Sequence, residues 1–151
     1  MMALLRPCLA VLAMMPITAL SQSQPAEADA PQAVVRAMIQ AWHDLDVDRV
    51  VELFAPDGVF HSVMLEPIVG REALRAHFEP VFAELERVEL RTVNMAVDGN
   101  VVFFERVDDF VYRGKHSQIP VAGVIEVANG RIQEWRDYYD RATMVEAMTV
   151  D

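Results

Sequence analysis

The sequence predicts a single α+β domain, in which a strongly curved antiparallel (mixed) sheet wraps around N-terminal helices and encloses a pocket. Three observations lead to this fold class. Apolar residues recur at helical spacing after Pro31, β-rich segments with alternating polarity follow from Val88, and short breaks of hairpin type separate these segments. Helices gathered at one end of the chain must cover one face of such a sheet. A strongly twisted sheet around helices leaves an apolar hollow, which favours a small-molecule site.

Length and composition fit one domain with its own core and exclude several classes of partner. The chain has 151 residues, of which 53% are hydrophobic and 24% are charged. The formal net charge is −10 and no stretch is rich in Lys or Arg. We therefore expect neither nucleic acid as a partner nor stable association with a membrane. Cys8, the single cysteine, lies too near the N-terminus to staple the fold or to join a cysteine metal site.

Residues 1–30 have the build of a signal peptide. Arg6 precedes an apolar run over residues 8–20, and residues 21–30 are small and polar with two Ala-x-Ala cleavage choices. The apolar run is too short for a comfortable transmembrane helix. If the segment is cleaved, we expect a periplasmic or secreted domain over residues 31–151. Otherwise the segment is an apolar N-terminal extension of a cytoplasmic protein.

Two helices are expected at the start of the domain. The first begins at Pro31, because proline suits the first turn of a helix. Its apolar residues recur at steps of three and four and are Val34, Val35, Met38, Ile39, Trp42 and Leu45. Asp48 is a candidate N-cap for a short second helix. That helix holds Val50, Val51 and Phe54.

A turn, an extended stretch and a third helix follow. Pro56-Asp57-Gly58 is a turn signal, which releases the chain into an extended stretch from Val59 to Met64. A helix after Gly70 places its apolar residues on one face, and Pro80 should bend or divide it. Those apolar residues are Leu74, Phe78, Val81, Phe82 and Leu85.

Four strands are predicted in the second half of the chain. They are Val88–Val97, Val101–Tyr112, His116–Val127 and Ile132–Tyr139. The breaks between them have hairpin chemistry and fall at Asp98-Gly99-Asn100, Arg113-Gly114-Lys115 and Asn129-Gly130. Consecutive hairpins of this kind make an antiparallel, meandering sheet.

Two charged residues share an apolar face of the second of these strands. Because side chains alternate along a strand, Arg106 and Asp108 point to the same side as Phe104 and Phe110. Burying two charges on such a face is costly unless they pair with each other and with further partners. We therefore expect Arg106 and Asp108 to be paired.

The last strand offers a second buried carboxylate. Trp135, Asp137 and Tyr139 share one face, so Asp137 lies among aromatic side chains and can point at the first pair. Two interpretations stay open from the residues alone. Arg106 with Asp108 or Asp137 is either a structural ion pair or the centre of a functional site.

Beyond these single residues, a longer pattern resembles a known family. Glu105-Arg106-Val107-Asp108 is followed by Gly130-Arg131-Ile132 and by Trp135-Arg136-Asp137-Tyr138-Tyr139-Asp140. In these residue types and their spacing the chain resembles the limonene epoxide hydrolase family, within the NTF2-like or SnoaL-like superfamily. The resemblance runs from about Phe54 to the C-terminus and includes Gly70-Arg71-Glu72-Ala73. It implies an NTF2-like cone and, as is usual for this fold, a homodimer.

The resemblance also implies a reaction and a set of roles. The family's catalytic Arg-x-Asp pair falls on Arg106 and Asp108, and its second catalytic Asp falls on Asp137. The implied reaction is the one-step, cofactor-independent hydrolysis of a small apolar epoxide, terpene-like or alicyclic, to a diol. Asp108 would be the acid, Asp137 the base that activates water, and Arg106 the bridge between them.

The water site departs from the family's pattern. The family holds the attacking water with a Tyr and an Asn, and Phe60 and Ser62 stand at the matching positions. Ser62 is then the expected water-positioning residue, although it lacks the amide of Asn. The substrate pocket is expected to be lined by Phe60, Met64, Phe104, Phe110 and Trp135.

No cofactor or metal is expected, and two other functions compete with hydrolysis. The four histidines, His43, His61, His77 and His116, lack ligand-like spacing. Asp44, Asp46 and Asp48 imitate a calcium loop without its Gly and Glu. The altered water site is also compatible with an isomerase or cyclase of the SnoaL or ketosteroid isomerase type, in which an Asp moves a proton on carbon. A third possibility is a non-catalytic protein that binds a small hydrophobic ligand in the pocket.

Overall fold

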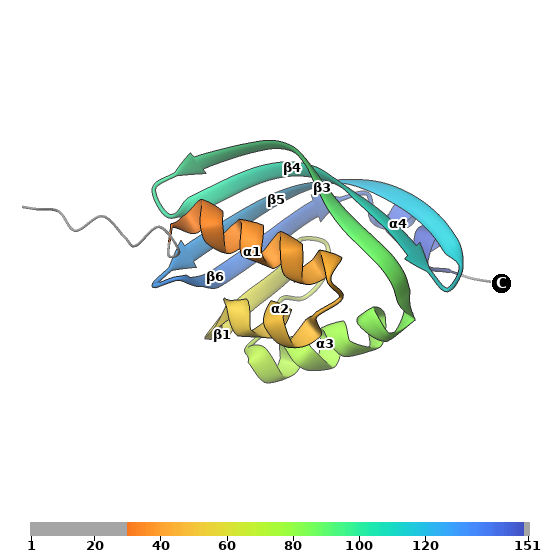
Figure 1. The fold of residues 1–151 in the computed structure, drawn as a ribbon, viewed down its shortest axis with the longest axis horizontal. Coiled ribbons are helices and arrows are strands. Elements are labelled where there is room, and N and C mark those ends of the chain that lie inside the picture. Colours follow the sequence, from red (N-terminus) through yellow and green to blue (C-terminus); the bar gives the residue numbers. More distant parts are fainter. Residues whose placement is uncertain (1–29, 150–151) are drawn as a thin grey trace, which may run out of the picture.

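The computed structural model describes residues 30–149, so the expected signal segment falls almost wholly outside the described residues. One six-stranded sheet arches over the helices α1, α2 and α3 (Figure 1). The order of its strands is β2-β1-β6-β5-β4-β3, with β2 and β3 as open edges. All neighbouring strands are antiparallel except β1 and β6, which are parallel, so the predicted α+β class with a mixed sheet is confirmed. Between residues 30 and 149 no helix is long and apolar enough to cross a membrane.

The first two helices form in the predicted parts of the chain, but Leu45 lies beyond the end of the first helix and Phe54 begins a strand instead of belonging to the second helix. Helix α1 spans Pro31–His43 with its proline in the first turn, and α2 spans Val47–Leu53. The cap of α2 differs from the prediction. The side chain of Asp46, not Asp48, accepts a hydrogen bond of 2.9 Å from the backbone N–H of Arg49. Asp48 lies two residues after the cap, within the first turn of the helix, and forms an ion pair with Arg75.

Helix α3 runs unbroken over Arg71–Glu84, so of the two effects expected of Pro80, a bend or a division, the division is wrong. Pro80 lies on the exposed side of the helix, and so does Ala76, whose carbonyl loses its helical partner. That carbonyl can turn toward water, which lets the helix continue.

Strand β1 begins earlier than predicted, at Phe54, and ends at Ser62. The Pro56-Asp57-Gly58 signal makes an irregularity within the strand, because the register with β6 shifts between Phe54 and Val59. Gly58 is required there, since a Cβ atom would lie 2.9 Å from the carbonyl oxygen of Ile132. Strand β2, Ile68–Val69, pairs with the end of β1 and was not predicted.

The remaining strands form the predicted meander. They are β3 Leu85–Asp98, β4 Val101–Tyr112, β5 Lys115–Ala128 and β6 Arg131–Tyr139. The turn between β5 and β6 has φ values of 53° at Asn129 and 68° at Gly130, the left-handed conformation that Asn-Gly favours. A fourth helix, α4 Arg141–Met148, follows β6 and was not predicted. Its N-cap is Asp140, whose side chain accepts a hydrogen bond of 2.7 Å from the N–H of Thr143.

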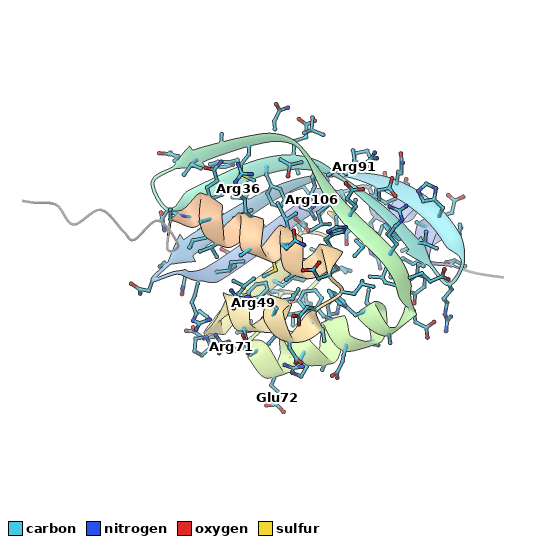
Figure 2. All side chains as sticks on the ribbon, in the orientation of Figure 1. Arg36, Arg49, Arg71, Glu72, Arg91 and Arg106 are labelled. Atoms are coloured by element: carbon cyan, nitrogen blue, oxygen red, sulfur yellow. The ribbon has the colours of Figure 1, made fainter. Side chains whose placement is uncertain are left out.

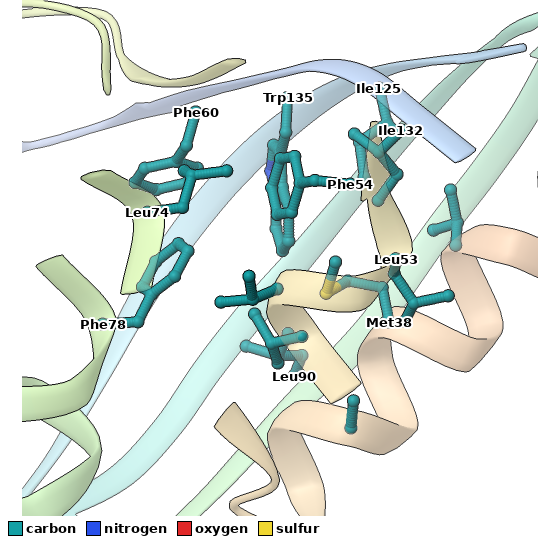
Figure 3. Packing of buried hydrophobic residues seen from close by; sticks show 14 of the residues in the cluster. Met38, Leu53, Phe54, Phe60, Leu74, Phe78, Leu90, Ile125, Ile132 and Trp135 are labelled. Atoms are coloured by element: carbon teal, nitrogen blue, oxygen red, sulfur yellow. The ribbon is translucent and has the colours of Figure 1, made fainter. Parts of the chain in front are cut away.

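The core lies between the concave face of the sheet and the helices. Figure 3 shows the rings of Phe54, Phe60, Phe78 and Trp135 gathered in this space. Phe54 stacks on Trp135 with ring centroids 6.3 Å apart, and Phe60 meets Phe78 edge to face at 5.1 Å. Three of these rings, Phe60, Phe78 and Trp135, also form part of the wall of a cavity that reaches α4.

Candidate active site

A cavity of about 440 Å³ lies beside this core. The inner face of the sheet, α3 and α4 enclose it, and most of its wall is apolar. Volume and apolar lining are those of a site for a small molecule. In Figure 2 Glu72 extends away from α3 at the edge of the molecule, whereas Arg106, which is buried, lies within its outline.

The three predicted charged residues come together on one wall of this cavity. Arg106 Nε donates to Asp108 Oδ1 at 2.7 Å, and Nη2 donates to Asp108 Oδ2 at 3.2 Å. Toward the other side, Nη1 and Nη2 donate to Asp137 Oδ1 and Oδ2 at 2.9 and 2.7 Å. The side chains are buried, with exposed fractions of 2% for Arg106, 9% for Asp108 and 5% for Asp137. Two fork-shaped pairs thus share one guanidinium.

A glycine on the strand between them makes this arrangement possible. Strand β5 separates β4 from β6, and Gly123 pairs with both Phe104 and Asp137. A Cβ atom at Gly123 would lie 2.9 Å from Arg106 Nη1 and closer still to the ring of Phe104. Gly123 therefore leaves the gap through which Arg106 crosses β5 to reach Asp137. This residue was missed by the sequence reasoning, because its role depends on a side chain that spans three strands.

Aromatic side chains contact the charged groups of the cluster. The guanidinium carbon of Arg106 lies 4.7 Å from the ring centroid of Phe104 and 5.4 Å from that of Trp135. Trp135 Nε1 also donates to Asp137 Oδ1 at 2.6 Å. Asp137 therefore accepts from two residues, whereas the hydrogen-bond donor to Asp108 is Arg106 alone among the described residues.

The electrostatic setting separates the roles that the groups can take. Burial raises the pKa of Asp108, Arg106 opposes this shift, and the nearby Asp137 carboxylate adds to it. Burial also works against the charge of Arg106, but the two carboxylates outweigh it and raise the pKa of the guanidinium. Arg106 is therefore a fixed cation, and the pKa of Asp108 is shifted in the direction that favours its protonated form.

Two expected members of the wall stand beside Asp137. Ser62 and Phe60 on β1 pair with Asp137 and Trp135 on the parallel strand β6, and both line the cavity. The Ser62 hydroxyl makes no hydrogen bond to protein within residues 30–149, so it is available to a ligand or to water. Its expected role in holding water stays a prediction.

Of the five residues expected to line the pocket, three do so and two do not. Phe60, Phe110 and Trp135 are on the cavity wall. Phe104 is buried but lies behind the guanidinium of Arg106 instead of on the wall. Met64 is 75% exposed, because β1 ends at Ser62 and the strand alternation that would turn Met64 inward stops there.

Helix α4 and His77 contribute wall residues that the sequence analysis did not assign to the pocket. Arg141, Met144 and Met148 from α4 line the cavity, as does His77 from α3. The helix could have been found from Asp140, a good N-cap directly before the stretch. Within the described part of the chain no cluster of His, Cys, Asp and Glu is arranged to hold a metal ion.

The open sheet arched over helices, with an apolar cavity and a buried Asp–Arg–Asp cluster, defines a class of small-molecule site that suits acid and base chemistry. Residues 29–150 match the family model described as the limonene-1,2-epoxide hydrolase catalytic domain, so the chain belongs to this family.

Individual relatives agree with this assignment. The chain is similar to the epoxide hydrolase EphG of Mycobacterium tuberculosis, with 29% identity over 114 residues that cover 76% of each protein. It is also similar to the solved structure of an M. tuberculosis LEH-like epoxide hydrolase, with a TM-score of 0.70 and 28% identity over 79% of this chain and 89% of that one. A SnoaL-like polyketide cyclase from Shewanella denitrificans has a TM-score of 0.70 at 16% identity, covering 78% and 96% of the two chains. That similarity shows a shared NTF2-like, SnoaL-like fold.

Proposed function

We propose that this protein hydrolyses the epoxide of a small, largely apolar molecule to a diol, in one step and without a cofactor. The observation that carries the proposal is the single guanidinium of Arg106, held between two buried carboxyl groups on the wall of an apolar cavity. The epoxide hydrolase EphG, which is 29% identical, supports the same reaction class.

Charge balance favours one proton shared by the cluster. Arg106 with two ionised carboxylates carries a net negative charge in an apolar site, which is costly. One proton makes the cluster neutral, and the raised pKa of Asp108 supports the proposal that Asp108 carries it. Asp108 is then the acid that protonates the ring oxygen.

Asp137 is the proposed base. A water molecule between Asp137 and Ser62 attacks one ring carbon while Asp137 takes its proton. The carbon–oxygen bond of the ring breaks, and the proton of Asp108 goes to the departing oxygen. The product is the diol, and proton exchange with solvent returns both carboxyl groups to their starting states. Trp135 and Arg106 stabilise negative charge on Asp137 before the attack.

The replaced water site sets an expectation for the rate. Phe60 meets Trp135 edge to face with centroids 5.7 Å apart, so its ring is fixed beside the site but offers no hydroxyl. Ser62 and Asp137 then orient the water. Together Phe60 and Ser62 offer it fewer hydrogen bonds than a Tyr and an Asn at these two positions would. Because orientation is a large part of catalysis by bound water, we expect slow turnover.

The presence of Phe60 and Ser62 in place of a Tyr and an Asn also favours a second candidate. This is an isomerase or cyclase in which Asp108 or Asp137 moves a proton on carbon and no water is consumed. The test is to supply a panel of terpene and cycloalkene epoxides and to measure the diol by chiral gas chromatography. Hydrolysis by the wild type, and none by Asp137→Asn, is the expected result. If no diol forms while solvent deuterium enters the carbon skeleton of a ketone ligand, the isomerase candidate replaces the hydrolase.

A further inference from the structure

Arg141 is a cation on the cavity wall, and its charge has no partner among residues 30–149. It is the first residue of α4, its side chain is exposed, and it lines the same cavity as Arg106, Asp108 and Asp137. Within residues 30–149 no carboxylate lies within 4.0 Å of its guanidinium.

This lack of a partner is unusual in this chain. The other described Lys and Arg side chains, Arg36 excepted, bind a carboxylate or backbone carbonyls. Arg36 lies on the exposed side of α1 and does not line the cavity. The neighbouring acid, Asp140, caps α4 through Thr143 and does not pair with Arg141.

The other basic groups on the wall do not supply a free positive charge. Both sides of the Arg106 guanidinium are occupied by carboxylates. Burial lowers the pKa of His77, so this imidazole is neutral at pH 7. Among the described residues of the wall, Arg141 is therefore the cation that a ligand can neutralise.

From this placement we infer that the substrate carries a carboxylate, which Arg141 binds while the hydrocarbon part fills the apolar cavity. Resting on the proposed hydrolase function, the inference names the substrate as an epoxide of a medium-length carboxylic acid, with its ring at Asp108 and Asp137. In a protein of formal net charge −10, an anion would otherwise be repelled from the surface. With one proton on the Asp–Arg–Asp cluster the charged groups of the wall sum to a single positive charge, which a carboxylate balances. A doubly charged phosphate would instead leave a net negative charge in the largely apolar site, which is costly.

The fold also limits the spacing between the two ends of such a substrate. Arg141 follows Asp137 by four residues, so their Cα atoms are at most about 14 Å apart, the reach of a fully extended chain of that length. Met144 and Met148 lie on the wall contributed by α4 and offer adaptable contacts to an alkyl or terpenoid chain.

Binding tests the inference without depending on turnover. Both tryptophans of the chain, Trp42 and Trp135, line the cavity, so quenching of their fluorescence reports its occupancy. The probes are decanoate and methyl decanoate, which differ in charge. We expect decanoate to bind about tenfold more tightly, the weight of one hydrogen-bonded charge pair at a partly exposed site. The preference should vanish in Arg141→Gln, remain in Arg141→Lys and be unchanged in the matched control Arg36→Gln.

Equal binding of the two probes to the wild type, or a preference that survives Arg141→Gln, would overturn the inference. Arg141 is exposed and unpaired among the described residues, so its substitution should leave the melting temperature unchanged, and loss of folding would not imitate the result.

Turnover separates this inference from the proposed function. The substrates are the terminal epoxide of undecenoic acid and its methyl ester. The acid should have a kcat/KM about tenfold higher, and Arg141→Gln should remove that advantage by raising KM for the acid with little change in kcat. Hydrolysis of both epoxides at equal efficiency would refute the proposed anion site and still support the proposed hydrolase function. Arg141-dependent binding of decanoate with no diol from either epoxide keeps the anion site and refutes the hydrolase.

Discussion

Replacing Gly123 by Ala tests whether the arrangement of the site depends on the gap in β5. Gly123 has no positive φ, so an alanine meets no backbone strain there. Such a substitution ordinarily stabilises a protein by about 0.4–1 kcal/mol, because it restricts the unfolded chain. Here the new Cβ atom would lie 2.9 Å from Arg106 Nη1 and closer to the ring of Phe104, and both side chains are buried.

The clash should outweigh the entropic gain. Overpacking a filled core costs about 1–3 kcal/mol. Subtracting the gain leaves a net destabilisation of about 0–2.6 kcal/mol, and the still closer approach of the new Cβ atom to the ring of Phe104 favours the upper half of that range. The melting temperature should then fall by about 3–10 °C. Displacing the guanidinium from Asp137 should also reduce diol formation by about a hundredfold, the effect of a misplacement on the order of 1 Å.

Thermal unfolding by circular dichroism and the diol assay measure both effects. Ala122→Val is the matched control, since Ala122 is the neighbouring residue on the exposed face of β5 and has room for extra methyl groups. Phe104→Leu combined with Gly123→Ala should recover part of the stability, because it removes the ring that the new methyl meets. A Gly123→Ala variant with an unchanged or higher melting temperature and full activity would refute the account of Gly123.

Three further predictions concern water, pH and export. Phe60→Tyr with Ser62→Asn should raise diol formation by about tenfold or more, since orienting water is a transition-state task; an unchanged kcat would argue against this reading of the water site. Asp109, outside the cavity, has its pKa lowered to about 2, first by its hydrogen bond to His116, so it stabilises the fold above its ordinary pKa and loses that contribution as pH falls toward 2. Acid titrations of wild type and Asp109→Asn should therefore converge at low pH, and parallel curves would contradict the assignment. Mass spectrometry of the periplasmic or secreted fraction should find a chain that lacks residues 1–30, whereas a full-length cytoplasmic chain would rule out cleavage.

The alternation of side chains along strands was enough to predict from the sequence that the charged residues lie together. Arg106 and Asp108 share a face because β4 is regular, and Asp137 comes within reach because the hairpins leave only β5 between β4 and β6. The same rule failed for Met64, since it holds only as far as the strand continues and β1 ends at Ser62.

Other parts of the site depend on tertiary contacts that spacing does not encode. The gap at Gly123 exists because an arginine from one strand passes over the next, a relation that appears only once three strands are in register. Arg141 lines the cavity because it is part of α4, a short helix that follows the last predicted strand and has weak amphipathic spacing. A helix of this length is stabilised mainly by its packing, so local pattern gave little signal for it.

A single-turnover reaction in heavy-oxygen water tests the central claim most directly. With enzyme in excess over epoxide, one-step attack by water must place the heavy oxygen in the diol during the first turnover. The account predicts a labelled diol, no label in the carboxyl groups of Asp108 or Asp137, and no diol from Asp137→Asn. An unlabelled diol in the first turnover would contradict it, because the oxygen would then have come from a carboxylate of the protein through a covalent intermediate.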